Sequence, residues 1–125
     1  MKRILFVDDE PLVLQALRRA LHGQRREWQM EFHLGAEAAL AEMAAAPFDV
    51  VVSDMRMPGM NGDQLLSIVR DRYPSCRRLI LSGYAEPDVT DRGKSLAHAY
   101  LTKPYVLNAL IAAIEGTESE TRSEP

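Results

Sequence analysis

Two short apolar runs that end in acidic residues constrain the fold of this chain more than any other feature. Residues 4–7 (Ile-Leu-Phe-Val) lead directly into Asp8 and Asp9, and residues 50–53 (Val-Val-Val-Ser) lead into Asp54. Continuous apolar runs of this length, rich in β-branched side chains, are typical of strands that are buried on both faces. Such strands occur almost only in parallel sheets covered by helices, so the sequence predicts an α/β fold.

Segments with helical periodicity alternate with strand-like runs along the chain. We expect five strands, near residues 3–7, 29–33, 49–53, 78–81 and 99–102. We expect helices from Pro11 to just before Gly23, over residues 36–46, from just after Gly62 to just before Tyr73, and over residues 106–115. A fourth helix within residues 88–98 is expected to be short or irregular, because Gly93 interrupts it. The alternation predicts a doubly wound parallel sheet with helices on both faces.

Length and charge limit the class of protein. With 125 residues the chain has room for one domain, over residues 1–115, and residues 116–125 have the composition of a disordered tail or linker. The net charge is −3 and the basic residues are scattered, which argues against direct binding of nucleic acid. No apolar run approaches the ~18 residues of a membrane span, and the single Cys76 fits a reducing compartment. We therefore expect a soluble, cytoplasmic protein.

Polar side chains follow four of the predicted strands at their carboxyl ends. They are Asp8 and Asp9, Asp54, Ser82, and Lys103. Ligands bind at this edge of open parallel sheets, so we expect these side chains to converge on one crevice. Three carboxylates that meet where water is scarce repel one another and need a cation. Oxygen ligands without His or Cys favour Mg²⁺, or Mn²⁺, over Zn²⁺.

These residues belong to longer motifs. The motifs are Asp8-Asp9, Asp54 followed by Met57-Pro58-Gly59, Ser82-Gly83-Tyr84-Ala85, and Tyr100-Leu101-Thr102-Lys103-Pro104. In order and spacing the set resembles the signature of the response-regulator receiver (CheY-like) domain, the phosphoacceptor module of two-component signalling. The resemblance covers about residues 2–115. It implies a flavodoxin-like, five-stranded parallel sheet with the strand order 2-1-3-4-5.

The resemblance implies roles for the site residues. Asp54 would be the phosphoacceptor, attacking a phosphoryl group carried by a histidine kinase, with Ser82 and Lys103 as the other catalytic residues. The Mg²⁺ ligands would be Asp8, Asp9, Asp54 and the backbone carbonyl of Met55. The domain would not be classed as an enzyme, although it would catalyse its own phosphorylation and its slow dephosphorylation.

The same resemblance predicts a switch. Phosphorylation would draw the Ser82 hydroxyl to the phosphoryl group, and Tyr100 would turn inward into the vacated space. The change would be presented on the face formed by the fourth helix, the fifth strand and the last helix. Arg56 and Tyr84 occupy positions that modulate dephosphorylation, and their bulk is expected to prolong the phosphoryl state. The bond between Lys103 and the following proline is expected to be cis.

A sensor histidine kinase is the implied partner. Residues 93–98 resemble a subset of receivers that precede output domains of the HD superfamily, so we expect a C-terminal output domain or a separate partner protein. A homodimer that depends on phosphorylation is a further expectation. Nucleic acid and membranes are not expected as direct partners.

Other functions stay open at this point. A pseudo-receiver that only binds partners would normally have lost Asp9, Asp54 or Lys103, and all three are present. A small phosphohydrolase would use Asp54 as a transient nucleophile, but the Asp-x-Asp pattern of haloacid-dehalogenase-type enzymes does not follow the first strand. A flavodoxin-like electron carrier is disfavoured because no Ser/Thr/Gly-rich phosphate loop follows that strand.

Overall fold

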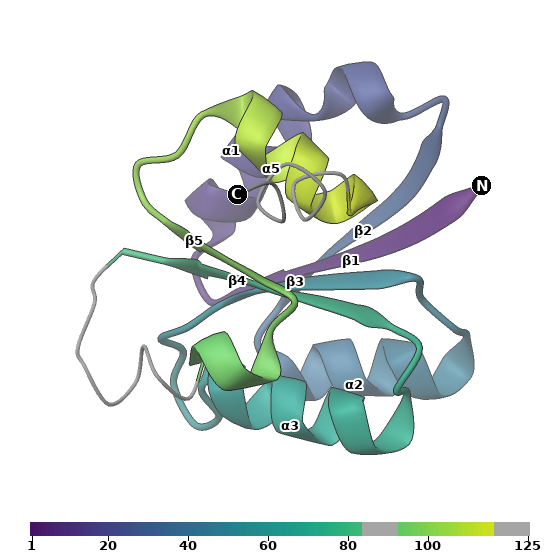
Figure 1. Ribbon diagram of the computed structural model, residues 1–125, viewed down its shortest axis with the longest axis vertical. Helices are drawn as coiled ribbons and strands as arrows, with labels where there is room; N and C mark the ends of the chain where they lie inside the picture. Colours follow the sequence, from purple (N-terminus) through teal and green to yellow (C-terminus); the bar gives the residue numbers. More distant parts are fainter. Residues whose placement is uncertain (84–92, 117–125) are drawn as a thin grey trace, which may run out of the picture.

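A five-stranded parallel sheet forms the centre of the computed structural model, which describes residues 1–83 and 93–116 (Figure 1). The strands are β1 (Lys2–Asp8), β2 (Trp28–Leu34), β3 (Val50–Asp54), β4 (Arg77–Ser82) and β5 (Ala99–Thr102). Their order is β2-β1-β3-β4-β5, and every neighbouring pair is parallel. The predicted fold class and strand order are confirmed, and each predicted strand end lies within one residue of the observed one.

Helices cover both faces of the sheet. They are α1 (Pro11–Ala20), α2 (Ala36–Ala45), α3 (Gly62–Arg72) and α5 (Leu107–Glu115), with a 3₁₀ turn, η1 (His22–Gln24), after α1. α1 and α5 lie on one face, and α2 and α3 lie on the other (Figure 1). No helix in the described part of the chain is long and apolar enough to cross a membrane.

Two predicted segments fall partly or wholly outside the described residues. Residues 93–96 are helical, but residues 84–92, which contain the rest of the predicted fourth helix and Tyr84, are outside the described ranges. The predicted tail, residues 116–125, is outside them from residue 117 onward. The predicted short or irregular form of the fourth helix therefore stays a prediction.

The first helix is shorter than the sequence predicts. It ends at Ala20, and the chain then tightens into η1, where the Gln24 N–H donates to the Leu21 carbonyl oxygen at 2.9 Å. Gly23 lies inside this turn. Leu21 is still fully buried. Its apolar spacing made the predicted helix too long, because the side chain packs in the core although the backbone there is no longer α-helical.

Two separate hydrophobic clusters explain the continuous apolar runs. Alternate residues of β1 point to opposite faces of the sheet. Ile4 and Phe6 pack into the cluster beneath α1 and α5, whereas Leu5 and Val7 pack into the cluster beneath α2 and α3. All four side chains are at most 2 % exposed. A central strand that is buried on both faces is apolar at successive positions. In the sequence it therefore appears as a continuous apolar run rather than as alternating apolar and polar residues.

The connection between β3 and α3 is tight. The Gly62 N–H donates to the Met55 carbonyl oxygen at 2.7 Å, and Asn61 and Gln64 form a capping box at the start of α3. A Cβ on residue 62 would overlap the carbonyl oxygen of Asp54, so only glycine allows this close approach. The end of β3 is thereby held against the start of α3.

Candidate functional site

A cavity of about 220 Å³ lies at the carboxyl edge of the sheet, and we call it the acidic cavity. Its lining residues are Asp9, Glu10, Asp54, Arg56, Ser82, Gly83 and Lys103. They come from the segments that follow β1, β3, β4 and β5, so four strand ends meet at one place. Glu10 was not singled out from the sequence. The signal for it was its position directly after the acidic pair.

Asp54 and Lys103 face one another in the acidic cavity. The Asp54 side chain is 13 % exposed, and its Oδ1 lies 3.5 Å from the Lys103 Nζ. Lys103 follows β5, where its N–H donates to the Ser82 carbonyl oxygen at 2.7 Å. The bond to Pro104 is cis, as expected from the sequence. An ammonium group is thus directed at the carboxylate that ends the central strand.

The acidic residues after β1 form a close group. Asp8 is 3 % exposed, and its Oδ1 accepts a hydrogen bond from the Glu10 N–H at 3.0 Å. Carboxylate oxygens of Asp8, Asp9 and Glu10 lie within 4.8 Å of one another. Together with Asp54, four carboxylates face two cationic side chains at this edge, a surplus of two negative charges when all are ionised.

Burial shifts the titration of two of these carboxyl groups. It raises the pKa of Asp8 to about 6, while the Glu10 N–H acts to lower that pKa and the Asp54 charge acts to raise it further. Burial also raises the pKa of Asp54, against the opposing effect of Lys103. Burial therefore disfavours the ionised form of both carboxyl groups. A hard divalent cation held by these carboxylate oxygens would supply the missing charge, so the donor set fits Mg²⁺.

The backbone carbonyl of Met55 is one of the predicted metal ligands. Its oxygen accepts the Gly62 N–H, and Met55 is absent from the described residues that line the cavity. The next residue, Arg56, does line it. The sequence could not separate these two residues, because the direction of a carbonyl group depends on the loop conformation and not on the side chain.

Ser82 and Tyr100 lie on neighbouring strands near one edge of the sheet. Ser82 ends β4, is 2 % exposed and lines the acidic cavity. Tyr100, on β5, packs against the cluster beneath α2 and α3, and its hydroxyl is buried without a hydrogen-bond partner among the described residues. A Cβ on Gly93 would meet both the Tyr100 ring and the end of the Met55 side chain. The ring is therefore packed against the start of the helical residues 93–96.

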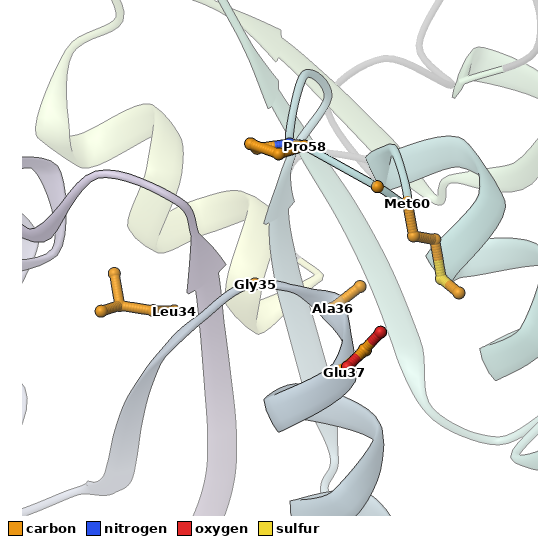
Figure 2. Close-up of a pocket in the computed structure, with 7 residues that line it drawn as sticks. Leu34, Gly35, Ala36, Glu37, Pro58 and Met60 are labelled. Atoms are coloured by element: carbon orange, nitrogen blue, oxygen red, sulfur yellow. The ribbon is translucent and has the colours of Figure 1, made fainter.

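A second cavity, of about 470 Å³, lies between the start of α2 and the loop that follows β3 (Figure 2). Its lining residues are Leu34, Gly35, Ala36, Glu37, Pro58, Gly59 and Met60. Figure 2 shows Ala36 and Glu37 on the α2 side and Pro58 and Met60 on the loop side. Glu37 is the one charged residue among the described residues that line this cavity. They therefore include no cluster of charged or nucleophilic side chains that could act in catalysis.

Residues 4–115 match the family model of the response regulator receiver domain. The chain belongs to this family. The matched residues include all five strands apart from the first two residues of β1. They also include all the residues that line the acidic cavity. The chain is accordingly a receiver domain of two-component signalling.

Curated relatives of this receiver are longer regulators. It is 38 % identical over 112 residues to the response regulator protein FleR of Pseudomonas aeruginosa and 34 % identical over 110 residues to the DNA-binding transcriptional regulator NtrC of Escherichia coli K12. Each alignment covers 87 % of this chain and 23 % of the relative. The receiver therefore spans less than a quarter of the length of these proteins.

Solved receiver structures share its fold. The signal receiver domain of an HD domain-containing protein from Pseudomonas fluorescens Pf-5 is 28 % identical, with a TM-score of 0.86 and coverage of 98 % of both chains. The response regulator TrrA of Thermotoga maritima, solved in complex with Mg²⁺-BeF, is 26 % identical, with a TM-score of 0.81 and coverage of 94 % of this receiver and 99 % of TrrA.

Proposed function

We propose that this receiver accepts a phosphoryl group on Asp54 from a sensor histidine kinase, in a reaction that requires a divalent metal ion. The observation that carries the proposal is the Asp54 carboxylate lying 3.5 Å from the Lys103 ammonium within a cavity. Asp54 ends the central strand of the sheet, which fixes the attacking atom. Positioning of this kind is the main requirement of phosphoryl transfer.

The transfer would not require a general base on the receiver, because the attacking carboxylate is already ionised. An ionised carboxylate oxygen of Asp54 attacks the phosphorus of a phosphohistidine, the P–N bond breaks, and the imidazole leaves and takes up a proton from solvent. The product is an acyl phosphate on Asp54. Lys103 would stabilise the charge on the transferred group, and the Ser82 hydroxyl, at the end of β4, would donate to one of its oxygens.

The metal ligands would be oxygen atoms of the acidic cavity. We assign them to the carboxylates of Asp9 and Asp54, which line the cavity, and to that of Asp8, which has an oxygen within 4.8 Å of one of Asp9. The fourth would be the backbone oxygen of Arg56 rather than that of Met55, because Arg56 lines the cavity. When bound, Mg²⁺ would neutralise negative charge on the carboxylates and on the transferring group. Mn²⁺ is the alternative ion. The Mg²⁺-BeF complex of the similar protein TrrA supports this choice.

Phosphorylation would act as a switch between two packings of one edge of the sheet. The phosphoryl group on Asp54 adds charge and acceptor oxygens, which would draw the Ser82 hydroxyl toward it. Tyr100 would then be held inward, beside Gly93. The altered surface would consist of residues 93–96, β5 and α5.

The lifetime of the acyl phosphate would depend on side chains at the rim of the acidic cavity. Arg56 lines this cavity and is exposed, so it can shield the phosphorus from attacking water. Tyr84, the second predicted modulator, lies outside the described residues. We expect dephosphorylation to be slow.

An apolar surface next to Lys103 would receive the kinase. A cavity of about 420 Å³ lies there, lined by Val13, Ala16, Leu17, Ala20, Lys103, Pro104, Tyr105 and Leu107. Leu12 at the start of α1 and Val106 before α5 are 76 % and 70 % exposed. Large apolar side chains that stay exposed beside a groove favour the docking of a helical partner.

We propose that the receiver domain, residues 1–115, controls an output through a linker that begins at residue 116. The similar receiver from the HD domain-containing protein supports an HD-type output, whereas the name of NtrC supports a DNA-binding one. A phosphorylation-dependent homodimer through the switch surface is part of the proposal. The reaction with a histidine kinase would take place in the cytoplasm.

The intact mass of the protein after incubation with acetyl phosphate and Mg²⁺ tests this function. We expect the addition of one phosphoryl group, which is lost in Asp54→Asn and when the metal is chelated. Asp71→Asn, at an exposed position on α3, is the matched control and should still be phosphorylated.

Two results would contradict the proposal. A protein that stays unmodified with acetyl phosphate and with a panel of phosphorylated kinases would be a pseudo-receiver. A continuous, rapid release of phosphate without accumulation of the modified form would indicate a phosphohydrolase.

A further inference from the structure

A second group of potential metal ligands lies on the edge strand β2. Glu31 and His33 are two residues apart, so their side chains point to the same face of the sheet. Their register partners on β1 are Leu5 and Val7, which pack into the cluster beneath α2 and α3. Glu42, from α2, completes the group. None of the three lines the acidic cavity.

The ligand atoms of this group are close together. One carboxylate oxygen each from Glu31 and Glu42 and one ring nitrogen of His33 all lie within 4.8 Å of one another. The Glu31 Oε1 and the His33 Nε2 are 3.1 Å apart. All three residues are half-buried, which limits the freedom of their side chains. Small rotations would bring the three atoms to one ion and leave a further position for water.

Arg3 holds one of these ligands in place. Its Nη2 donates to the Glu31 Oε2 at 2.9 Å, and its guanidinium lies 4.3 Å from the centre of the Phe48 ring. Oε1 is thereby left directed at His33. A hydrogen bond to the far oxygen of a carboxylate is the arrangement that orients metal ligands in proteins.

We propose that Glu31, His33 and Glu42 form a binding site for Zn²⁺. The mixture of one imidazole and two carboxylates matches the ligands that Zn²⁺ takes in proteins, whereas Mg²⁺ prefers oxygen ligands alone. The imidazole also distinguishes this group from an acidic surface patch. Zn²⁺ would replace the hydrogen bond between Glu31 and His33, with a deprotonated ring nitrogen of His33 as the ligand. The bound ion would link the edge strand β2 to α2.

Titration calorimetry of the full chain with Zn²⁺, in a buffer that contains excess Mg²⁺, tests the site. We expect one saturable Zn²⁺ site whose affinity falls at least ~10-fold in His33→Ala and in Glu42→Gln. His22→Ala is the matched control because His22 is exposed in η1, and this variant should keep the wild-type affinity. Zn²⁺ should also raise the unfolding midpoint of the wild type more than that of His33→Ala.

Three results would overturn the proposal. One is an equal Zn²⁺ affinity in the wild type and His33→Ala, and another is a loss in His22→Ala as large as that in His33→Ala. The third is Zn²⁺ binding that disappears only in Asp9→Asn, which would place the ion in the acidic cavity. If His33→Ala does not fold, the ring ¹⁵N signals of the wild type decide, because a His33 signal that does not shift with Zn²⁺ rejects the site. None of the three proposed ligands belongs to the site proposed for phosphorylation at Asp54.

Discussion

Burial sets different properties for the neighbouring acidic residues Asp8 and Asp9. Asp8 is buried and has a raised pKa, whereas the adjacent Asp9 is half-buried. The difference arises because β1 ends between them, so Asp8 still belongs to the sheet and Asp9 does not. In the proposed site, the deeper residue would hold the metal ion at the greater electrostatic cost and the outer one would exchange more easily with water.

Asp8 should make the metal-free protein less stable as the pH rises. Its folded pKa of about 6 lies above the ordinary 3.8, so the folded state holds a proton that the unfolded chain has released. Stability is therefore lost between about pH 4 and about pH 6, by an amount on the order of 2–3 kcal/mol. Asp8→Asn should raise the free energy of unfolding near neutral pH, and the gain should shrink below about pH 5.

Urea unfolding with a chelator present, at pH values from about 4 to about 8, measures this effect. Asp71→Asn serves as the control because Asp71 is exposed on α3. A gain in Asp8→Asn that does not change with pH would show that the titration of Asp8 is not its cause.

The Tyr100 hydroxyl should lower the stability of the folded state. It is buried without a hydrogen-bond partner among the described residues. Such a group loses its hydrogen bonds to water on folding and forms no new ones in their place. Tyr100→Phe should therefore raise the free energy of unfolding by about 1 kcal/mol. Tyr73 is half-buried, and its hydroxyl is not among the buried groups without a partner. Tyr73→Phe should therefore not raise the free energy of unfolding. A destabilised Tyr100→Phe protein would contradict the prediction.

At the scale of elements, the sequence predicts strands better than helix ends. The strands were located to within a residue because the β1 and β3 runs are buried on both faces and polar residues end them. The end of α1 was placed too late because Leu21 continues the apolar spacing while the backbone already follows η1. Periodicity reports which side chains are buried, and it does not report the type of turn that buries them.

Gly62 should be essential for the junction of β3 and α3. In Gly62→Ala, the added Cβ would overlap the Asp54 carbonyl oxygen and approach the Met55 Cα, and neither backbone atom can move aside easily. We expect a loss of at least ~2 kcal/mol in the free energy of unfolding. Gly23→Ala is the matched control, since a Cβ there has no atom within 4 Å and φ is not positive. Similar stabilities of the two variants in urea unfolding would contradict this account.

At the scale of the whole molecule, both ligand groups depend on contacts between distant segments. The acidic cavity could be anticipated because parallel strands bring all their carboxyl ends to one edge of the sheet. The group on β2 and α2 could not, because the pairing of Glu31 with Glu42 depends on how α2 lies across the sheet. The sequence also does not indicate whether the carbonyl group of Met55 or that of Arg56 is the better candidate metal ligand, since this depends on the path of a loop.

Metal binding should stabilise the whole molecule if the acidic cavity holds Mg²⁺. A ligand at a hundred times its dissociation constant adds about 2.7 kcal/mol to the free energy of unfolding. We expect the unfolding midpoint of the wild type to rise with Mg²⁺ concentration and that of Asp9→Asn to respond much less. Thermal unfolding followed by circular dichroism measures this difference. The same response in both proteins would place the ion elsewhere.

β3 and β5, which carry the proposed phosphoacceptor and the proposed switch residue, differ in their positions in the sheet. β3 is hydrogen-bonded to a strand on each side, whereas β5 is the outermost strand among the described residues and pairs there with β4 alone. In the proposed switch, Tyr100 would therefore repack on β5 without displacing Asp54, the proposed phosphoacceptor at the end of β3. In a genetic selection, substitutions that uncouple output while phosphate uptake continues should accumulate along β5 and residues 93–96. Substitutions within β3 should abolish both properties together.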